Sequence, residues 1–119
     1  FEPQRLVFQT LCANVALNSL TNVHCLQRAL GRERGAITVP TLDPTRPQNF
    51  GGLAIEGHQA GEQVDLARLD DMGLPRCDFI KLDVEGMEQG VLEGAVETIA
   101  KYRPLLYVEN DRKDRSDAL

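Results

Sequence analysis

The sequence contains no apolar stretch that approaches the roughly 20 residues of a membrane span. It does not open with a basic segment followed by an apolar one, the pattern of a secretory signal. Basic residues are in the minority, with 13 Lys and Arg against 18 Asp and Glu, for a net charge of −5. This balance argues against a general nucleic-acid or anionic-membrane surface. We therefore expect a cytoplasmic protein that binds neither.

Cysteine is scarce, and its pattern excludes two kinds of site. Cys12, Cys25 and Cys77 form an odd and widely spaced set, which fits neither a disulfide framework nor a zinc site. We expect three reduced, partly buried thiols. The remaining composition, 42% hydrophobic and 26% charged, is ordinary for a globular protein. A length of 119 residues suits one small domain, which we place at 1–119.

Strand and helix patterns alternate along the chain. Periodicity and turn residues predict helices at 4–17 and 86–101, a helical turn at 70–75, and strands at 1–2, 23–30, 79–82 and 105–108. Residues 36–69 contain three further short strands, at 36–42, 50–55 and 64–68, and look like a small antiparallel excursion. The order β-α-β, excursion, β-α-β predicts an α/β fold with a mainly parallel sheet.

The stretch from Asp78 to Gly86 is the most informative part of the chain. An apolar strand, interrupted only by Lys81, stops at Asp83, and Glu85 follows two residues later. Ligands of open α/β sheets bind beyond the carboxyl ends of the strands, where such turns gather. Lys81 shares a strand face with Asp83, and we expect it to pair with a carboxylate rather than to meet an anionic substrate. In the following helix, glycines 86, 90 and 94 share one face and favour close packing.

Acidic residues end three predicted strands, and in a parallel sheet these ends share one edge. Glu2, Asp83 and the pair Glu109-Asn110 should therefore converge on one cleft. A carboxylate at Glu2 matches a ribose diol, although capping and surface roles are open to it. Asp83 and Glu85 suit general bases, metal ligands or helix-capping anions. Asp83 with Glu109 and Asn110 gives an all-oxygen set suited to Mg²⁺.

Four blocks of sequence together resemble the FkbM-type methyltransferases. They are Phe1-Glu2-Pro3, the turn Ala29-Leu30-Gly31 followed by Gly35, the block Lys81-Leu82-Asp83-Val84-Glu85-Gly86, and Val108-Glu109-Asn110. The resemblance covers nearly the whole chain in the right order. Its most specific part is the Lys-Leu-Asp-Val-Glu-Gly block.

The resemblance implies an incomplete Rossmann-like class I methyltransferase fold and S-adenosylmethionine as methyl donor. It further implies methyl transfer to a hydroxyl oxygen of a small sugar or natural product. By this similarity Glu2 is the ribose-binding acid, Ala29 and Leu30 contact adenine, and Asp83 faces the transferred methyl. Asp83 is then the first choice for a catalytic residue, Glu85 the second, with Lys81 beside them to meet a carboxylate or an anionic substrate.

Two further features follow from the resemblance. Catechol-type O-methyltransferases hold Mg²⁺ with a strand-end Asp and an Asp-Asn pair, so Mg²⁺ at Asp83, Glu109 and Asn110 is a hypothesis. In the sequence, the family's first strand and glycine-rich methionine-binding loop should precede Phe1. In the sheet, that strand should lie between the strands that carry Glu2 and Asp83. We therefore expect these 119 residues alone to bind cofactor weakly and to be inactive, and exposed sheet edges to favour a homodimer.

Three alternatives remain open. Residues 69–83 also resemble the metal-binding segment of EAL-type cyclic-dinucleotide phosphodiesterases, but that barrel is about twice as long and the Glu-Ala-Leu signature is absent. A response-regulator receiver would need a lysine where Glu109-Asn110 stands. The third alternative is a non-catalytic α/β fragment that serves only in interactions.

Overall fold

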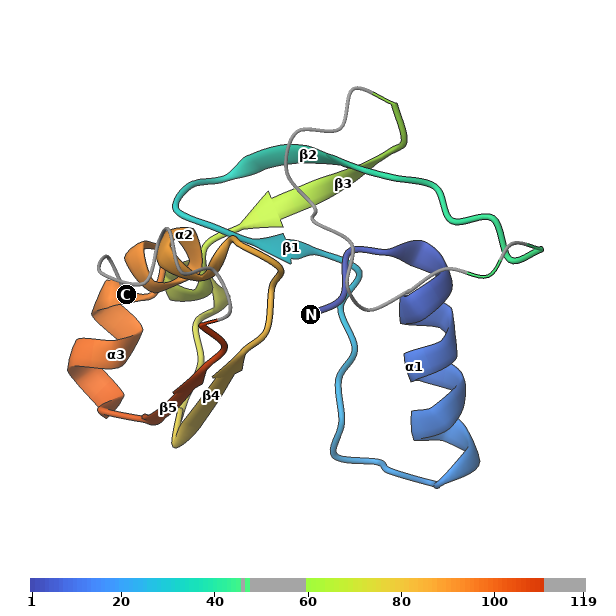
Figure 1. The fold of residues 1–119 in the computed structure, drawn as a ribbon. Coiled ribbons are helices and arrows are strands. Elements are labelled where there is room, and N and C mark those ends of the chain that lie inside the picture. The colour runs from blue at the N-terminus through green and yellow to red at the C-terminus, as the bar shows by residue number, and fades with distance from the viewer. Residues whose placement is uncertain (46, 48–59, 111–119) are drawn as a thin grey trace.

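The computed structural model describes residues 1–45, 47 and 60–110. These residues form a mixed α/β fold with two separate sheets (Figure 1). No helix in this part of the chain is long and apolar enough to cross a membrane. The elements in chain order are α1 (Arg5–Leu17), β1 (Ala29–Leu30), β2 (Gly35–Val39), β3 (Glu62–Ala67), the 3₁₀ turn η1 (Leu69–Met72), β4 (Phe79–Leu82), α2 (Glu88–Glu93), α3 (Val96–Tyr102) and β5 (Leu105–Val108).

The larger sheet has three strands in the order β1-β3-β2. β2 and β3 are antiparallel, with Ile37 opposite Val64, which confirms the predicted excursion. β3 then runs parallel to β1, with Ala29 opposite Leu66. β2 ends at Val39 rather than at residue 42, because Pro40 has no N–H to donate. The strand predicted at 50–55 lies outside the described residues.

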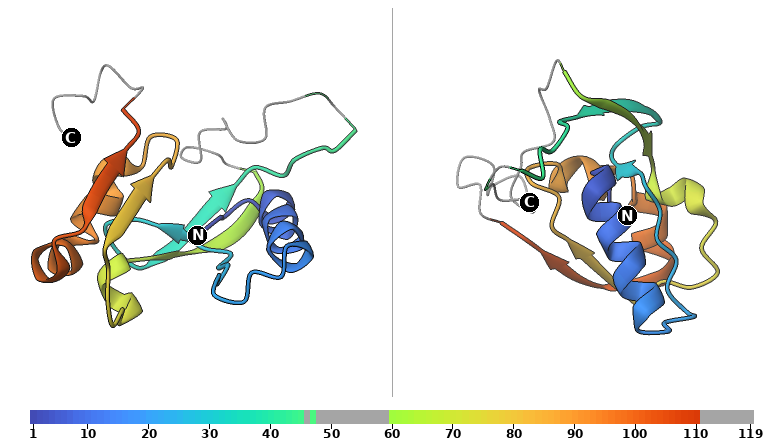
Figure 2. Two further views of the ribbon diagram at one scale, coloured as in Figure 1. Left: turned by 90° about the horizontal axis from the view of Figure 1, so that it is seen from below. Right: turned by 90° about the vertical axis from the view of Figure 1, so that its right-hand side faces the viewer.

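The smaller sheet is the parallel pair β4–β5, which confirms both predicted strands. α2 and α3 connect the two strands and cover one face of the pair (Figure 2). In this unit Leu82, Val91 and Ala95 are buried. The opposite face exposes large apolar side chains, since Phe79 is 55% and Leu105 is 69% exposed. Within the described residues, the smaller sheet is therefore covered on one face only.

Several sequence-based expectations were wrong. Residues 1–2 are not in a strand, and of 23–30 only Ala29 and Leu30 are. A strand needs a neighbour, and β3 pairs with β1 at those two residues alone; the carbonyl of Leu26 instead accepts the N–H of Glu2 at 3.0 Å. Nor do the described strands join into one mainly parallel sheet, so a Rossmann-like arrangement is not confirmed.

The predicted helix over 86–101 is split in two. Gly86 precedes it with φ of 101°, and a break at Gly94 and Ala95 separates α2 from α3. Glycine is a poor helix former, but position 94 has no room for any other residue. A Cβ on Gly94 would lie 2.0 Å from the carbonyl oxygen of Gly31. The predicted close packing is confirmed at Gly94, and it joins the helical layer to the turn after β1.

α1 begins as predicted and depends little on burial. The side chain of Gln4 accepts the N–H of Leu6 at 3.1 Å and so caps the helix. Arg5 forms an ion pair with Glu62 of β3 at 3.0 Å. None of the residues in α1 is fully buried. The helix is therefore held mainly by its cap, polar contacts and half-buried side chains.

Asp70 of η1 anchors α3 from a distance. Its side chain is only 2% exposed and accepts backbone N–H groups from Thr98 at 2.8 Å and Glu97 at 3.2 Å. Arg68 adds an ion pair at 3.1 Å. Burial by itself raises the pKa of Asp70, but the hydrogen bonds from Thr98 and Glu97 and the charge of Arg68 outweigh it, so the pKa is lowered. The carboxylate supplies the N-terminal cap that α3 lacks locally.

Replacing Asp70 by Asn should lower the free energy of unfolding by about 1–3 kcal/mol, because charged hydrogen bonds at a buried site are lost. Since folding lowers the pKa of Asp70, its contribution is complete above the unfolded pKa of about 3.9. It is lost as the pH falls through the folded-state value. Urea unfolding between pH 3 and 7 measures both effects. Asp65→Asn, at an exposed carboxylate, is the matched control, and equal effects of the two variants would contradict this role.

Candidate functional site

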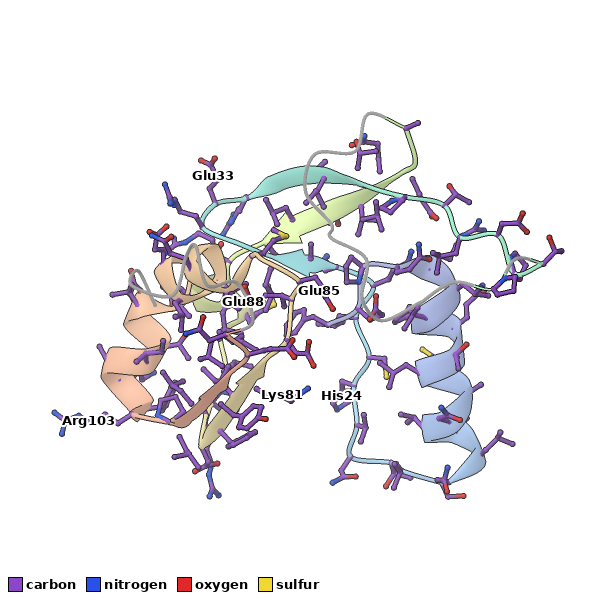
Figure 3. All side chains as sticks on the ribbon, viewed as in Figure 1. His24, Glu33, Lys81, Glu85, Glu88 and Arg103 are labelled. Carbon is purple, nitrogen blue, oxygen red and sulfur yellow. The ribbon has the colours of Figure 1, made fainter. Side chains whose placement is uncertain are left out.

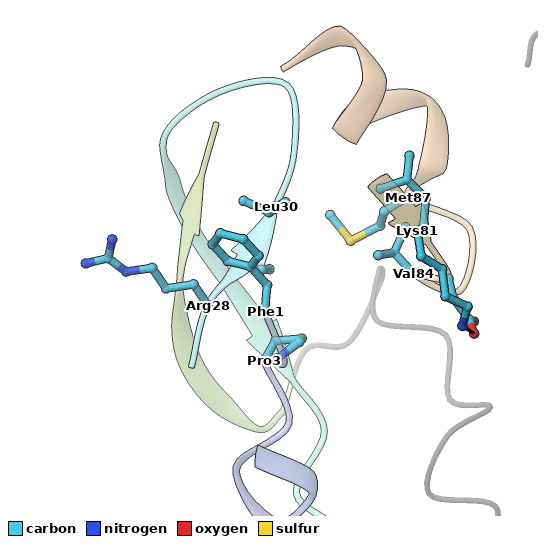
Figure 4. A pocket seen from close by; sticks show the side chains of 10 residues that line it. Phe1, Pro3, Arg28, Leu30, Lys81, Val84 and Met87 are labelled. Atoms are coloured by element: carbon cyan, nitrogen blue, oxygen red, sulfur yellow. Dashed lines mark hydrogen bonds and ion pairs between the residues drawn. The ribbon is translucent and has the colours of Figure 1, made fainter. Parts of the chain in front are cut away.

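A cavity of about 270 Å³ separates the two sheets. One wall is built from the first residues of the chain and from β1, and the other from the end of β4 and its loop (Figure 4). Phe1 and Leu30 face Met87 and Val84 across it. The cavity thus brings together segments that lie far apart in the sequence, and its walls are largely apolar.

The predicted cofactor residues lie partly in this cavity. Ala29 and Leu30 line it, as does Asp83. Glu2 is not among the lining residues, although Phe1 and Pro3 on either side of it are. Its carboxylate accepts the backbone N–H of Gln4 at 2.7 Å, and burial raises the pKa of Glu2. In this structure Glu2 therefore fixes the start of α1, and its ribose role stays a prediction.

Three carboxylates gather at the ends of the parallel strands. Asp83, Glu85 and Glu109 each place an oxygen within 4.8 Å of the others. The register of the smaller sheet causes this, because Leu82 lies opposite Val108 and the N–H of Glu109 donates to the carbonyl of Leu82 at 2.9 Å. Among the described His, Cys, Asp and Glu, Glu2 does not belong to the cluster. Two of the three expected strand-end acids therefore meet, joined by Glu85.

Lys81 partly neutralises this cluster. Its side chain extends from β4 (Figure 3). Its Nζ lies 2.6 Å from Oδ2 of Asp83, which confirms the predicted pairing with a carboxylate. The hydrogen bond from Lys81 and a second one with Glu109 lower the pKa of Asp83, and Asp83 in turn raises the pKa of Lys81. Asp83 is therefore ionised near neutral pH. It is a strong hydrogen-bond acceptor and a weak base.

The loop after β4 has an unusual backbone. Glu85 has φ of 52° and Gly86 of 101°, so a non-glycine residue occupies the left-handed region at a cost of order 1–3 kcal/mol. The reversal holds Val84 at the cavity wall and Glu85 in the acidic cluster. Such strain persists only where neighbouring contacts fix the loop.

Comparison with known protein families identifies the family of this chain. A family model described as the methyltransferase FkbM domain matches residues 1–117. The chain belongs to the FkbM methyltransferase family. The expected resemblance is thereby confirmed, and the cavity and acidic cluster are features of an FkbM-family chain.

Two similar proteins carry the methyltransferase name. One is Methyltransferase 1 of Beauveria bassiana (strain ARSEF 2860), 31% identical over 79% of this chain and 47% of its own length. The other is Methyltransferase sdnD of Sordaria araneosa, 30% identical over 82% of this chain and 50% of its own length. The FkbM-family chain therefore spans about half the length of these curated relatives. No solved structure matches it significantly.

Sequence reasoning missed Glu88, which organises the loop of this FkbM-family site. Glu88 is only 5% exposed, and its Oε1 accepts the N–H groups of Val84 at 3.1 Å and Gly86 at 3.2 Å. A glutamate in the first helical turn that reaches back to preceding N–H groups is the logic of a capping box. In the sequence, the position of Glu88 two residues after Gly86, at the start of a helix, was the signal for such a cap. Phe1 and Met87 of the cavity were missed because apolar residues carry no comparable signal.

Replacing Glu88 by Ala should lower the free energy of unfolding by about 1–3 kcal/mol, because two partly buried N–H groups lose their acceptor. Glu88→Gln keeps an acceptor oxygen and should recover much of the loss. Chemical denaturation measures both variants. Gln89→Ala, at the exposed neighbouring position, is the control. A Glu88→Ala protein as stable as this control would show that the loop does not depend on Glu88.

Proposed function

We propose that this FkbM-family chain takes part in S-adenosylmethionine-dependent methyl transfer to a hydroxyl oxygen of a sugar or another small natural product. The observation that carries the proposal is the cavity that joins Ala29 and Leu30 to Asp83. In a family of methyltransferases, a largely apolar cavity with a carboxylate at its rim suits a donor on one side and a polar acceptor on the other.

The apolar walls suit the donor. Leu30 and Phe1 on one side and Met87 on the other offer surfaces against which an adenine ring can pack. When bound, S-adenosylmethionine supplies a methyl group on a positively charged sulfur. The ionised Asp83 and its neighbour Glu85 place negative charge near such a cation. The chain's contribution is to hold donor and acceptor within contact distance in a shielded space.

Asp83 suits the acceptor side. An ionised carboxylate at the cavity rim can accept a hydrogen bond from a hydroxyl group and take its proton as the oxygen becomes a nucleophile. Because Lys81 and Glu109 lower the pKa of Asp83, it is a weak base. Its main effect should be to orient the hydroxyl. Lys81 then keeps Asp83 charged, and Glu85 is the second candidate for proton removal.

The cluster also offers oxygen donors to a hard cation. Asp83, Glu85 and Glu109 have the ligand chemistry that Mg²⁺ prefers, and Asn110 follows directly in the sequence. Against this, Lys81 already neutralises Asp83. A bound Mg²⁺ would polarise the acceptor oxygen. We keep Mg²⁺ as a secondary part of the proposal that the methyl-transfer chemistry does not require.

Binding of the donor tests the proposal directly. The complete polypeptide that contains this chain should bind S-adenosylmethionine in isothermal titration calorimetry. Leu30→Glu should weaken binding at least about tenfold, because it puts a carboxylate into an apolar wall. Leu20→Glu, at an exposed leucine outside this cavity, should leave binding unchanged. Absence of any donor binding by the unsubstituted protein would refute the proposal.

Transfer of a labelled methyl group tests Asp83. Asp83→Asn should lower kcat roughly 10²-fold, at the low end for a lost proton acceptor, and should weaken donor binding much less, because the neighbouring Glu85 remains. Asp78→Asn is the matched control, because Asp78 stands at the other end of β4 and pairs with Arg76 as Asp83 pairs with Lys81. Equal rates in the two variants would remove Asp83 from the mechanism. Activity that persists in a chelator would remove Mg²⁺ only.

A further inference from the structure

Two cysteines that the sequence separates are neighbours in the structure. Cys12 lies on α1, and Cys25 lies on the segment that returns from α1 toward β1 (Figure 1). Partial burial, and next the nearby Cys25, raise the pKa of the Cys12 thiol. Both cysteines line the same surface depression, together with His24, and both are partly exposed. Their wide spacing in the sequence gave no sign of this proximity, which a chain reversal creates.

The reversal itself is well defined. Asn18 ends α1, and Ser19 follows with φ of 54°. The N–H of Leu20 then donates to the carbonyl of Val15 at 3.1 Å, so the chain turns back along the helix. At its far end, the returning segment is fixed where the carbonyl of Leu26 accepts the N–H of Glu2. Cys12 and Cys25 therefore lie between two fixed points of the chain.

We propose that Cys12 and Cys25 form a reactive dithiol pair that a low-molecular-weight disulfide of the glutathione class oxidises to an intramolecular disulfide. This modification site goes beyond methyl transfer and does not depend on it. Two thiols that line one depression can approach each other to a sulfur–sulfur bond length of about 2 Å if the backbone between them can move. The backbone can supply that movement, because α1 has no fully buried side chain and residues 22–28 have no regular secondary structure.

The chemistry balances with the named oxidant. The thiolate of one cysteine attacks a sulfur of glutathione disulfide, which forms a mixed disulfide and releases one glutathione thiolate. The thiolate of the second cysteine then attacks the protein sulfur of that mixed disulfide and releases the second glutathione. Two protein thiols are oxidised, one disulfide is reduced to two thiols, and the protons of the protein thiols pass to the released glutathione.

Proximity rather than unusual acidity makes this pair reactive. Partial burial, and next the neighbouring Cys25, raise the pKa of the Cys12 thiol. The first step with an external disulfide is therefore slow for Cys12 near neutral pH. The second step is intramolecular, so it is fast as soon as either sulfur carries glutathione. The mixed disulfide should not accumulate while both cysteines are present.

Tryptic mapping tests the proposal with an internal control. Cleavage after Arg5 and Arg28 releases peptide 6–28, which holds Cys12 and Cys25 and no other cysteine. Cleavage after Arg76 and Lys81 releases peptide 77–81, which holds Cys77 alone. The protein is treated with glutathione disulfide, its remaining thiols are alkylated, and it is digested without reduction.

We expect peptide 6–28 to lose about 2 Da and take up no alkyl group, as a disulfide requires. Peptide 77–81 should carry an alkyl group or a single glutathione. Peptide 6–28 with two alkyl groups, with glutathione attached, or linked to a second copy of itself would overturn the proposal. This result is read from the unsubstituted protein, so it does not depend on a variant that folds.

Two variants then test the order of steps. Cys25→Ser removes the resolving thiol, so peptide 6–28 should keep one glutathione on Cys12. Cys77→Ser is the matched control and should form the bridge in peptide 6–28 as the unsubstituted protein does. A bridge that requires Cys77, or a Cys25→Ser protein that still loses 2 Da from peptide 6–28, would refute the pairing.

Discussion

The joint between the two sheets is the contact on which the described structure depends. It is made by backbone atoms, where the carbonyl of Gly31 lies against Gly94 so closely that no Cβ would fit. The N–H of Asp70 donates to the carbonyl of Gly94 at 3.0 Å, and the side chain of Asp70 caps α3. One small region thus fixes the three-stranded sheet, the 3₁₀ turn and the helical layer. The cavity between the sheets has its position because of this joint.

The joint also explains why the candidate site has two dissimilar halves. The three-stranded sheet supplies an apolar wall with Ala29 and Leu30, and the parallel pair supplies Asp83, Glu85 and Glu109. Strand pairing within each sheet forms its own half of the site. The space between the two sheets is where an apolar ring and a polar acceptor could lie together. Asp70 lies in the segment that resembles the metal-binding part of EAL-type phosphodiesterases, but its carboxylate is occupied by α3 and Arg68.

The sequence predicted best where local pattern and long-range pairing agree. β4, its acidic loop and β5 follow from apolar runs that stop at acids, and the Lys81–Asp83 pair follows from their spacing on one strand. Prediction failed where the outcome depends on a distant partner. Residues 23–28 have strand-forming side chains but no neighbouring strand in the described structure, and the break at Gly94 is set by Gly31. Glu88 was missed because its role exists only once the loop has folded back over it.

The weak anchoring of α1 has a consequence for how the molecule fluctuates. A helix of 13 residues with no fully buried side chain gains little from tertiary packing, which is the usual source of helical stability in proteins. Its opening should cost much less free energy than opening of the β2–β3 pair, which includes the buried Val39, Val64 and Ala67. α1 can therefore fray and reform on its own while both sheets stay intact. Because the same helix carries Cys12, this local breathing sets how often the two sulfur atoms approach each other.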